Sequence, residues 1–301
     1  NSCGPSTLAH YLRFYGWNGD QTKIIEKVQS EPEDRNVNVE ELVYYVRNFA
    51  GWLKAEFRVG GDLVLLRRFI AAGIPVMIET GTSLDQDYWP GDDRWAGHYL
   101  LMIGYDESKA TFVAHDAWRG PHRVMTNDEV EQTWQPFNHV YIMVYPPDKE
   151  AAVKALLGAD WDPEANRKHA LEDAQAKTKS DPKNAFAWFN YGSNLLFFDR
   201  YTESAAAYDT ARQLNLPQRF LRYQFGPYIA YFHGSRISDL MALADYGLRM
   251  SPTSEETMLW KAWGFYRQGN KEEALKLLDK ALEINPRYED AKYAISFIQK
   301  N

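Results

Sequence analysis

The sequence of 301 residues contains a single cysteine, Cys3. One cysteine excludes an intramolecular disulfide framework and any zinc site built on several thiolates. No apolar run approaches the roughly 18 residues that a membrane span needs. Acidic residues outnumber basic ones, 41 against 34, so the excess of Lys and Arg typical of nucleic-acid-binding proteins is absent. Hydrophobic residues make up 45% of the chain, enough to bury a sizeable core in about two domains.

The start of the sequence, Asn1-Ser2-Cys3, has no initiator Met and no charged or apolar leader. Such a start is typical of a processed or trimmed chain. Localisation therefore cannot be read from the sequence directly, and processing slightly favours an extracytoplasmic location.

The texture of the sequence changes at Pro146-Pro147. Before it, short β-branched and aromatic runs with strand character alternate with turn signals; these runs are Leu53–Val59, Ile74–Glu79, Tyr99–Tyr105, Thr111–Asp116 and Val140–Tyr145. Residues 39–49 and 62–72 carry helical periodicity instead. After it, nearly every segment has a helical period. The sequence therefore predicts one domain of mixed helices and strands over residues 1–147 and an all-α domain over residues 148–301.

The second half repeats. Prolines 182, 217, 252 and 286 are 35, 35 and 34 residues apart, close to the period of the tetratricopeptide repeat, a helix–turn–helix unit. Residues with the size expected at the packing positions of the second helices recur in the same frame: Ser204, Tyr208, Ala211, Ala274, Leu278 and Ala281. We expect three to four helix pairs, with residues 148–180 as a looser pair and residues 287–301 as a closing helix.

Cys3 stands at the predicted start of a helix, because Pro5 suits a first turn and Leu8 and Leu12 have helical spacing. The free amides and positive dipole end of a helix N-terminus stabilise a thiolate, the attacking form of a cysteine nucleophile. The alternative is a small apolar side chain packed at a helix start.

His98 begins an apolar strand, and the next strand ends on the carboxylate of Asp116. Two antiparallel strands joined by a short turn at residues 106–109 bring the start of one beside the end of the other. We therefore expect His98 and Asp116 to be neighbours, with a buried structural histidine as the alternative. Because a nucleophile needs a base and the base needs an orienting group, Cys3, His98 and Asp116 form the candidate catalytic site.

Four motifs occur in order: Cys3-Gly-Pro-Ser-Thr-Leu-Ala9, Ala72-Gly-Ile-Pro-Val76, Gly97-His-Tyr-Leu-Leu-Met-Ile-Gly-Tyr-Asp106 and His115-Asp116. Together they resemble the bacteriocin-processing (double-glycine leader) peptidase-like domains of the papain-like cysteine peptidases. The resemblance implies an α+β papain-like peptidase domain, followed here by an all-α tetratricopeptide-repeat solenoid. It also implies Cys3 as nucleophile, His98 as general base and acid, and Asp116 as the residue that orients His98.

The implied reaction is hydrolysis of a peptide or amide bond through a thioester. Domains of this kind usually carry a Gln roughly six positions before the cysteine, whose amide helps to bind the oxyanion. No such Gln can be assigned in this sequence, which leaves the backbone amide of Cys3 as a donor. Two alternatives stay open: a catalytically silent peptide-binding or scaffolding protein, and an acyltransferase that passes the thioester to an amine.

The loop of residues 84–95, which runs into His98, contains four carboxylates: Asp85, Asp87, Asp92 and Asp93. Solvated loop charges are one interpretation. A substrate-facing lid that selects cationic peptides, or that holds a calcium ion without the spacing of an EF-hand, is the other.

His115 and His122 flank Asp116 in the sequence and could form a metal cluster with His98. No His-x-x-x-His pair or second cysteine supports zinc, and His115 should point away from Asp116 along a strand. We expect no metal and no cofactor. The expected partners are a peptide or protein substrate and a protein bound by the repeats, where aromatic residues are denser than a helical core requires.

Overall fold

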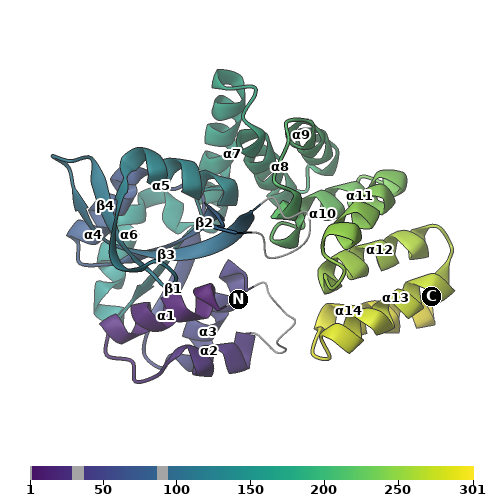
Figure 1. The fold of residues 1–301 in the computed structure, drawn as a ribbon, viewed down its shortest axis with the longest axis horizontal. Coiled ribbons are helices and arrows are strands. Elements are labelled where there is room, and N and C mark those ends of the chain that lie inside the picture. The colour runs from purple at the N-terminus through teal and green to yellow at the C-terminus, as the bar shows by residue number, and fades with distance from the viewer. Residues whose placement is uncertain (1, 29–36, 87–93) are drawn as a thin grey trace. The chain divides into compact units, whose positions relative to one another are not determined.

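The computed structural model describes residues 2–28, 37–86 and 94–301, and its contacts divide the chain into two compact units (Figure 1). The first comprises residues 2–28, 37–85 and 95–182, and the second comprises residues 183–301. None of the helices in these ranges is both long and apolar enough to cross a membrane.

One antiparallel sheet organises the described part of the first unit. Its strands are β1 (Lys54–Arg58), β2 (Val76–Ser83), β3 (Trp95–Asp106), β4 (Thr111–Asp116), β5 (Gly120–Thr126) and β6 (Tyr141–Tyr145). They lie in the order β1-β6-β2-β3-β4-β5, and each neighbouring pair is antiparallel. Five of them overlap the strands expected from the sequence. The edge strand β5 was not expected, and its exposed polar residues explain why the pattern does not reveal it.

Helices cover both faces of this sheet (Figure 1). On one side lie α1 (Cys3–Phe14), α2 (Gln21–Val28) and α3 (Val39–Phe49), and on the other lie α4 (Leu63–Ala71), α5 (Asn127–Trp134) and α6 (Glu150–Leu157). Side-chain caps fix two starts: Asn38 accepts from the backbone of Glu41 at 2.9 Å, and Asp62 accepts from that of Leu65 at 2.6 Å. Short 3₁₀ segments occupy Gln135–Phe137, Pro147–Lys149, Gly158–Trp161 and Gln218–Arg222.

Between the sheet and helices α4, α5 and α6 lies a hydrophobic core. It forms because alternate side chains along each strand point toward these helices. Ile78 and Leu100, on β2 and β3, pack with Phe69 of α4 and Trp134 of α5, all at most 1% exposed. The indole Nε1 of Trp134 donates to the carbonyl of Val140 at 2.7 Å, so the largest side chain of this core is also hydrogen-bonded.

Residues 148–182 pack on the first unit. Val153 and Leu157 of α6 belong to the core just described. On α7 (Pro163–Ser180), the Asn166 amide donates to the carbonyl of Val59 at 2.9 Å and accepts from its N–H at 3.1 Å. Contacts therefore group these helices with the sheet. The domain boundary between residues 147 and 148 therefore stays a prediction that residues 1–147 and 148–301 form separate domains.

The second unit is a row of helix pairs. Its described α-helices are α8 (Ala185–Phe197), α9 (Tyr201–Gln213), α10 (Gly226–His233), α11 (Ile237–Met250), α12 (Glu255–Arg267), α13 (Lys271–Ile284) and α14 (Glu289–Lys300). Small residues let the paired helices approach: a Cβ added to Gly192 would lie 2.9 Å from the ring of Tyr208. The six packing residues expected from the repeat period are all buried.

Candidate active site

Cys3 is the first residue of α1, where backbone amides have no partner within the helix. The position of the helix is set by contacts further along it. Thr7 Oγ1 donates to the carbonyl of Tyr99 at 3.2 Å. A Cβ on Gly4 would lie 3.2 Å from the Tyr99 ring, so glycine permits this close approach. The Cys3 side chain is partly exposed, as a nucleophile requires.

His98 lies on β3 with only 5% of its surface exposed. Its Nε2 is 2.8 Å from Oδ1 of Asp116, and the imidazole also interacts with the thiol of Cys3. Because Nε2 is engaged by the carboxylate, Nδ1 is the nitrogen left for sulfur. Thr80 on β2 donates to the carbonyl of His98 at 3.1 Å, which fixes the backbone at this point.

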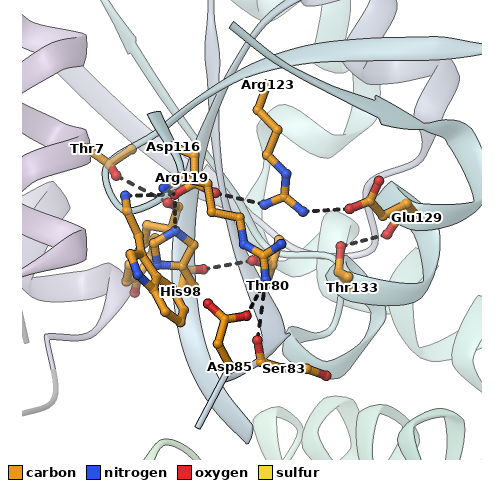
Figure 2. Close-up of polar contacts among 12 residues, drawn as sticks. Thr7, Thr80, Ser83, Asp85, His98, Asp116, Arg119, Arg123, Glu129 and Thr133 are labelled. Atoms are coloured by element: carbon orange, nitrogen blue, oxygen red, sulfur yellow. Dashed lines mark hydrogen bonds and ion pairs between the residues drawn. The ribbon is translucent and has the colours of Figure 1, made fainter. Parts of the chain in front are cut away.

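Asp116, the last residue of β4, is 3% exposed and fully hydrogen-bonded (Figure 2). Besides His98, its Oδ1 accepts from the backbone of Trp118 at 2.8 Å and of Arg119 at 3.0 Å. Its Oδ2 accepts from Nη1 of Arg123 at 2.8 Å. The carboxylate thus orients the imidazole and the turn that follows β4 at the same time.

The electrostatics of the three side chains favour an ion pair. Burial opposes ionisation of Cys3, yet the hydrogen bond and positive charge of His98 lower the pKa of the thiol below its ordinary value. Burial also opposes charge on His98, but its bonds to Asp116 and Cys3 raise its pKa to about 9. Burial acts against Asp116 too, and the bonds from His98 and the backbone nevertheless hold its pKa well below the usual range. These shifts favour the form of the site with a thiolate, an imidazolium and a carboxylate.

Two residues beside His98 were missed by the sequence reasoning. The indole of Trp118, 41% exposed, meets the His98 ring edge-on at a centroid distance of 6.2 Å. The guanidinium of Arg119 lies 5.7 Å from the centre of a Trp118 ring and 3.9 Å from Asp85. Their positions two and three residues after Asp116 could have identified them, since a strand that ends at a site is followed by a turn beside that site.

Glu79 is a second omission of the sequence reasoning. It lies on β2 opposite Tyr99 and is 7% exposed. Burial, together with the nearby charges of Cys3 and Glu40, raises the pKa of Glu79 well above its usual value despite a hydrogen bond with Tyr99. The raised pKa favours the neutral form of Glu79, which places no negative charge beside the Cys3 thiol. No local pattern marks a glutamate on an otherwise apolar strand as neutral.

The histidines do not assemble a metal site. His115 pairs with His122 at a ring distance of 4.9 Å and with His10 at 6.4 Å, while Nε2 of His98 is engaged by Asp116. Within residues 2–28, 37–86 and 94–301, no three His, Cys, Asp or Glu side chains are arranged to hold a metal ion. Of the four loop carboxylates, Asp87, Asp92 and Asp93 lie outside the described residues, so the lid hypothesis stays a prediction.

A helix-covered sheet with this site, followed by helical repeats, defines a cysteine-peptidase-like domain joined to a repeat solenoid. The family models agree: residues 1–142 match the Peptidase_C39 like family, and residues 256–288 match the tetratricopeptide repeat. The match of residues 1–142 to a Peptidase_C39-like domain confirms the resemblance seen in the motifs. No curated protein matches the sequence.

Solved structures show likeness in fold alone. A C39-like peptidase family protein from Bacillus anthracis is 17% identical, with 48% of this chain and 88% of that chain covered and a TM-score of 0.36. MamA from Desulfovibrio magneticus RS-1 is 10% identical, with 45% and 75% covered and a TM-score of 0.41. YrrB, a tetratricopeptide-repeat protein with an unusual peptide-binding site, is 15% identical, with 48% and 88% covered and a TM-score of 0.23.

Proposed function

We propose that the protein is a cysteine peptidase that hydrolyses a peptide or related amide bond with Cys3, His98 and Asp116. The observation that supports this most strongly is that the His98 imidazole, 2.8 Å from the buried Asp116 carboxylate, also interacts with the Cys3 thiol. A buried structural histidine needs one such partner. A histidine held between a fixed carboxylate and a partly exposed thiol has the arrangement of a nucleophile and its base.

The reaction follows from these groups. The Cys3 thiolate attacks the substrate carbonyl carbon, and free amides at the start of α1 stabilise the oxyanion. When the tetrahedral intermediate collapses, the C–N bond breaks and the His98 imidazolium gives its proton to the leaving amine. Neutral His98 then takes a proton from water, whose oxygen attacks the thioester. Release of the carboxylic acid restores the thiolate and the imidazolium, while Asp116 keeps the ring aligned throughout.

Hydrolysis is tested with a library of fluorogenic peptides, using the unaltered chain and Cys3→Ser. His122→Ala is the matched control, because it removes an exposed imidazole from β5 without touching any of the three proposed catalytic residues. We expect cleavage by the unaltered chain and the control, and its loss by at least about a thousandfold in Cys3→Ser. Equal rates for the unaltered chain and Cys3→Ser would contradict the proposal and favour a silent peptide-binding domain.

The acyltransferase alternative differs only in what attacks the thioester. Adding a primary amine to the cleavage reaction separates the two, since a transferase forms the amide product at the expense of the free acid. We expect the free acid to dominate, because nothing in the described site selects an amine over water.

We further propose that the repeats recruit a protein, either the substrate or an assembly partner. The observation behind this is a set of aromatic side chains that touch across three helices. The ring centroids of Phe232 in α10 and Trp263 in α12 are 6.1 Å apart, and those of Trp263 and Phe297 in α14 are 5.6 Å apart. Tyr293, 6.2 Å from Phe297, is 65% exposed. Phe297, 36% exposed, and Tyr293 form the exposed end of this set, and exposed aromatic side chains are typical of binding surfaces.

The recruiting role is tested by comparing a short peptide substrate with the same peptide placed in an unfolded protein. Tyr293→Ala is expected to raise KM for the protein several-fold and to leave kcat/KM for the short peptide unchanged. Lys292→Ala, one residue away and also exposed, is the control. Unchanged kinetics on both substrates would remove the recruiting role.

A further inference from the structure

Arg123 joins the candidate site to the edge of the sheet. It lies on β5, with 17% of its side chain exposed, and forks between two carboxylates (Figure 2). Nη1 is 2.8 Å from Oδ2 of Asp116, and Nη2 is 2.5 Å from Oε1 of Glu129 in α5. The Asp116 side chain is 1% exposed, whereas that of Glu129 is 39% exposed. The inner half of the fork is therefore the one shielded from water.

The two oxygens of Asp116 accept hydrogen bonds from different donors, and Arg123 is the side chain that bonds to Oδ2. Oδ1 receives three N–H donors, from His98, Trp118 and Arg119, while Oδ2 receives the guanidinium. A carboxylate is symmetric and can rotate about its terminal bond unless both oxygens are held. A planar guanidinium that is itself held at its other end opposes that rotation.

The pairing of β4 with β5 places Arg123 and Asp116 on the same face of the sheet. Between Ala114 and Asp116 the pairing of β4 with β5 is irregular, so that Ala114 is opposite Arg123 while Asp116 is opposite Gly120. Irregularities of this kind redirect side chains at the edges of sheets. The Arg123 side chain reaches the carboxylate diagonally, two positions along the strand.

We propose that Arg123 is a positioning residue, which holds Asp116 ionised and turned toward His98 although Arg123 itself touches neither the sulfur nor the reacting carbonyl. The proposal rests on the function proposed above and adds a residue that no part of that function uses. The charged and titratable side chains that face Asp116 are His98 on β3 and Arg123 on β5, whereas Arg119 in the following turn bonds to it only through its backbone N–H. Glu129 of α5 reaches it only through Arg123, and Cys3 only through His98.

The test is the rate of Cys3 alkylation by iodoacetamide from about pH 4 to about pH 10, with the thermal midpoint of unfolding measured on each variant. In Arg123→Met, Asp116 turns more freely and protonates more readily, so the imidazolium supports the thiolate less. We expect labelling at about pH 5–6 to be slower by about tenfold, the equivalent of one pKa unit. Arg123→Lys, which keeps a cation at Oδ2, should return most of the rate. Arg123→Gln gives the same comparison as Arg123→Met if the methionine variant does not fold.

Glu129→Gln is the matched control, because it weakens the outer half of the fork and leaves the bond to Asp116 in place. We expect its labelling profile to follow that of the unaltered chain. A lower thermal midpoint for Arg123→Met without any change in its profile would overturn the proposal and leave Arg123 as a structural tie. An equal shift in Glu129→Gln would overturn it as well. An ordinary thiol titration in the unaltered chain would instead defeat the proposed function itself, and with it any positioning role.

Discussion

His98 and Asp116 are bonded neighbours without being register partners. His98 is opposite Thr80 of β2, whereas Asp116 is opposite Leu100, two residues further along β3. Positions two apart share a face of the strand, so the imidazole meets the carboxylate diagonally, at 2.8 Å. A slip of β4 by one residue would turn Asp116 to the opposite face and break this bond.

Replacing His98 is expected to raise the pKa of the Cys3 thiol, which the intact site lowers. In His98→Ala the burial that raises the pKa of the thiol remains, while the bond and charge that lower it are lost. Alkylation by iodoacetamide at about pH 6 should slow by at least about tenfold. His10→Ala, on the same helix as Cys3, serves as the control and should label as the unaltered chain does. Similar rates in all three proteins would mean that no ion pair exists.

The free energy of unfolding is expected to depend on pH through Cys3 and His98 together. A depressed thiol pKa contributes stability that is lost as the pH falls through the folded value. A raised imidazole pKa contributes stability that is lost as the pH rises through about 9. Above both the lowered thiol pKa and about pH 6.5, and below about pH 9, the folded pair and the unfolded pair each bind one proton, so the two effects cancel. Below about pH 6.5 the unfolded imidazole binds a proton too, so this part of the stability rises with pH wherever the folded thiolate persists.

Cys3→Ala should change the sign and the range of this dependence. Without the thiol, only the part of the upward shift of the His98 pKa that Asp116 causes remains, so stability is level below about pH 6.5 and falls as the pH rises above it. The slope of the difference between the two proteins should approach about 1.4 kcal/mol per pH unit. Urea unfolding of both proteins at several pH values gives this difference, in which the other titrating groups cancel. Parallel curves would show that the two residues are not coupled.

A chain ending at Pro147 is expected to be less stable than one ending at Pro182. The shorter chain lacks Val153 and Leu157, and full burial of such side chains is worth about 1.5–3 kcal/mol each. We therefore expect the free energy of unfolding in urea to be lower by at least about 3 kcal/mol. Glu164→Ala in the longer chain, at an exposed position of α7, should have little effect. Equal stabilities would support the boundary between residues 147 and 148.

Gly192→Val is expected to push α8 away from α9. The added Cβ alone would lie 2.9 Å from the Tyr208 ring, and overpacking of this kind costs about 1–3 kcal/mol. Ala206→Val, at an exposed position on α9, introduces valine into a helix without the close contact and should cost only a few tenths of a kcal/mol. Thermal unfolding of the whole chain measures both. If the two variants lose the same stability, the close contact carries no energetic weight.

The features that the sequence predicts best are those encoded by local periodicity. Short apolar, β-branched and aromatic runs predicted the strands β3 and β4, and the short turn between them was enough to predict that His98 and Asp116 are neighbours. The proline spacing likewise predicted the helix pairs, since each repeat has the same physical need to end its second helix. The catalytic role of His98 and Asp116 stays a prediction, because the positions of side chains do not measure turnover.

The features that it missed are set by contacts between distant segments. Arg123 and Glu79 are of charged types that usually lie in water, and only the folded sheet brings them to a buried site. The helical period of residues 148–180 is genuine, but a period does not state which surface the helix covers. These two helices look like a repeat in the sequence, and their apolar residues nonetheless pack against the sheet.

The point at which α1 is attached to the sheet determines how far a small tilt of the helix displaces the Cys3 sulfur. The Tyr11 hydroxyl donates to the carbonyl of Pro75 and accepts from the N–H of Val144, which ties the helix to two parts of the sheet. Cys3 lies two turns earlier, about 12 Å along the helix axis. A tilt of α1 by only about 5° about this attachment would displace the sulfur by about 1 Å, and a misplacement of that size can cost a hundredfold in rate. Reactivity of Cys3 should therefore report small rotations of α1 long before unfolding is detectable.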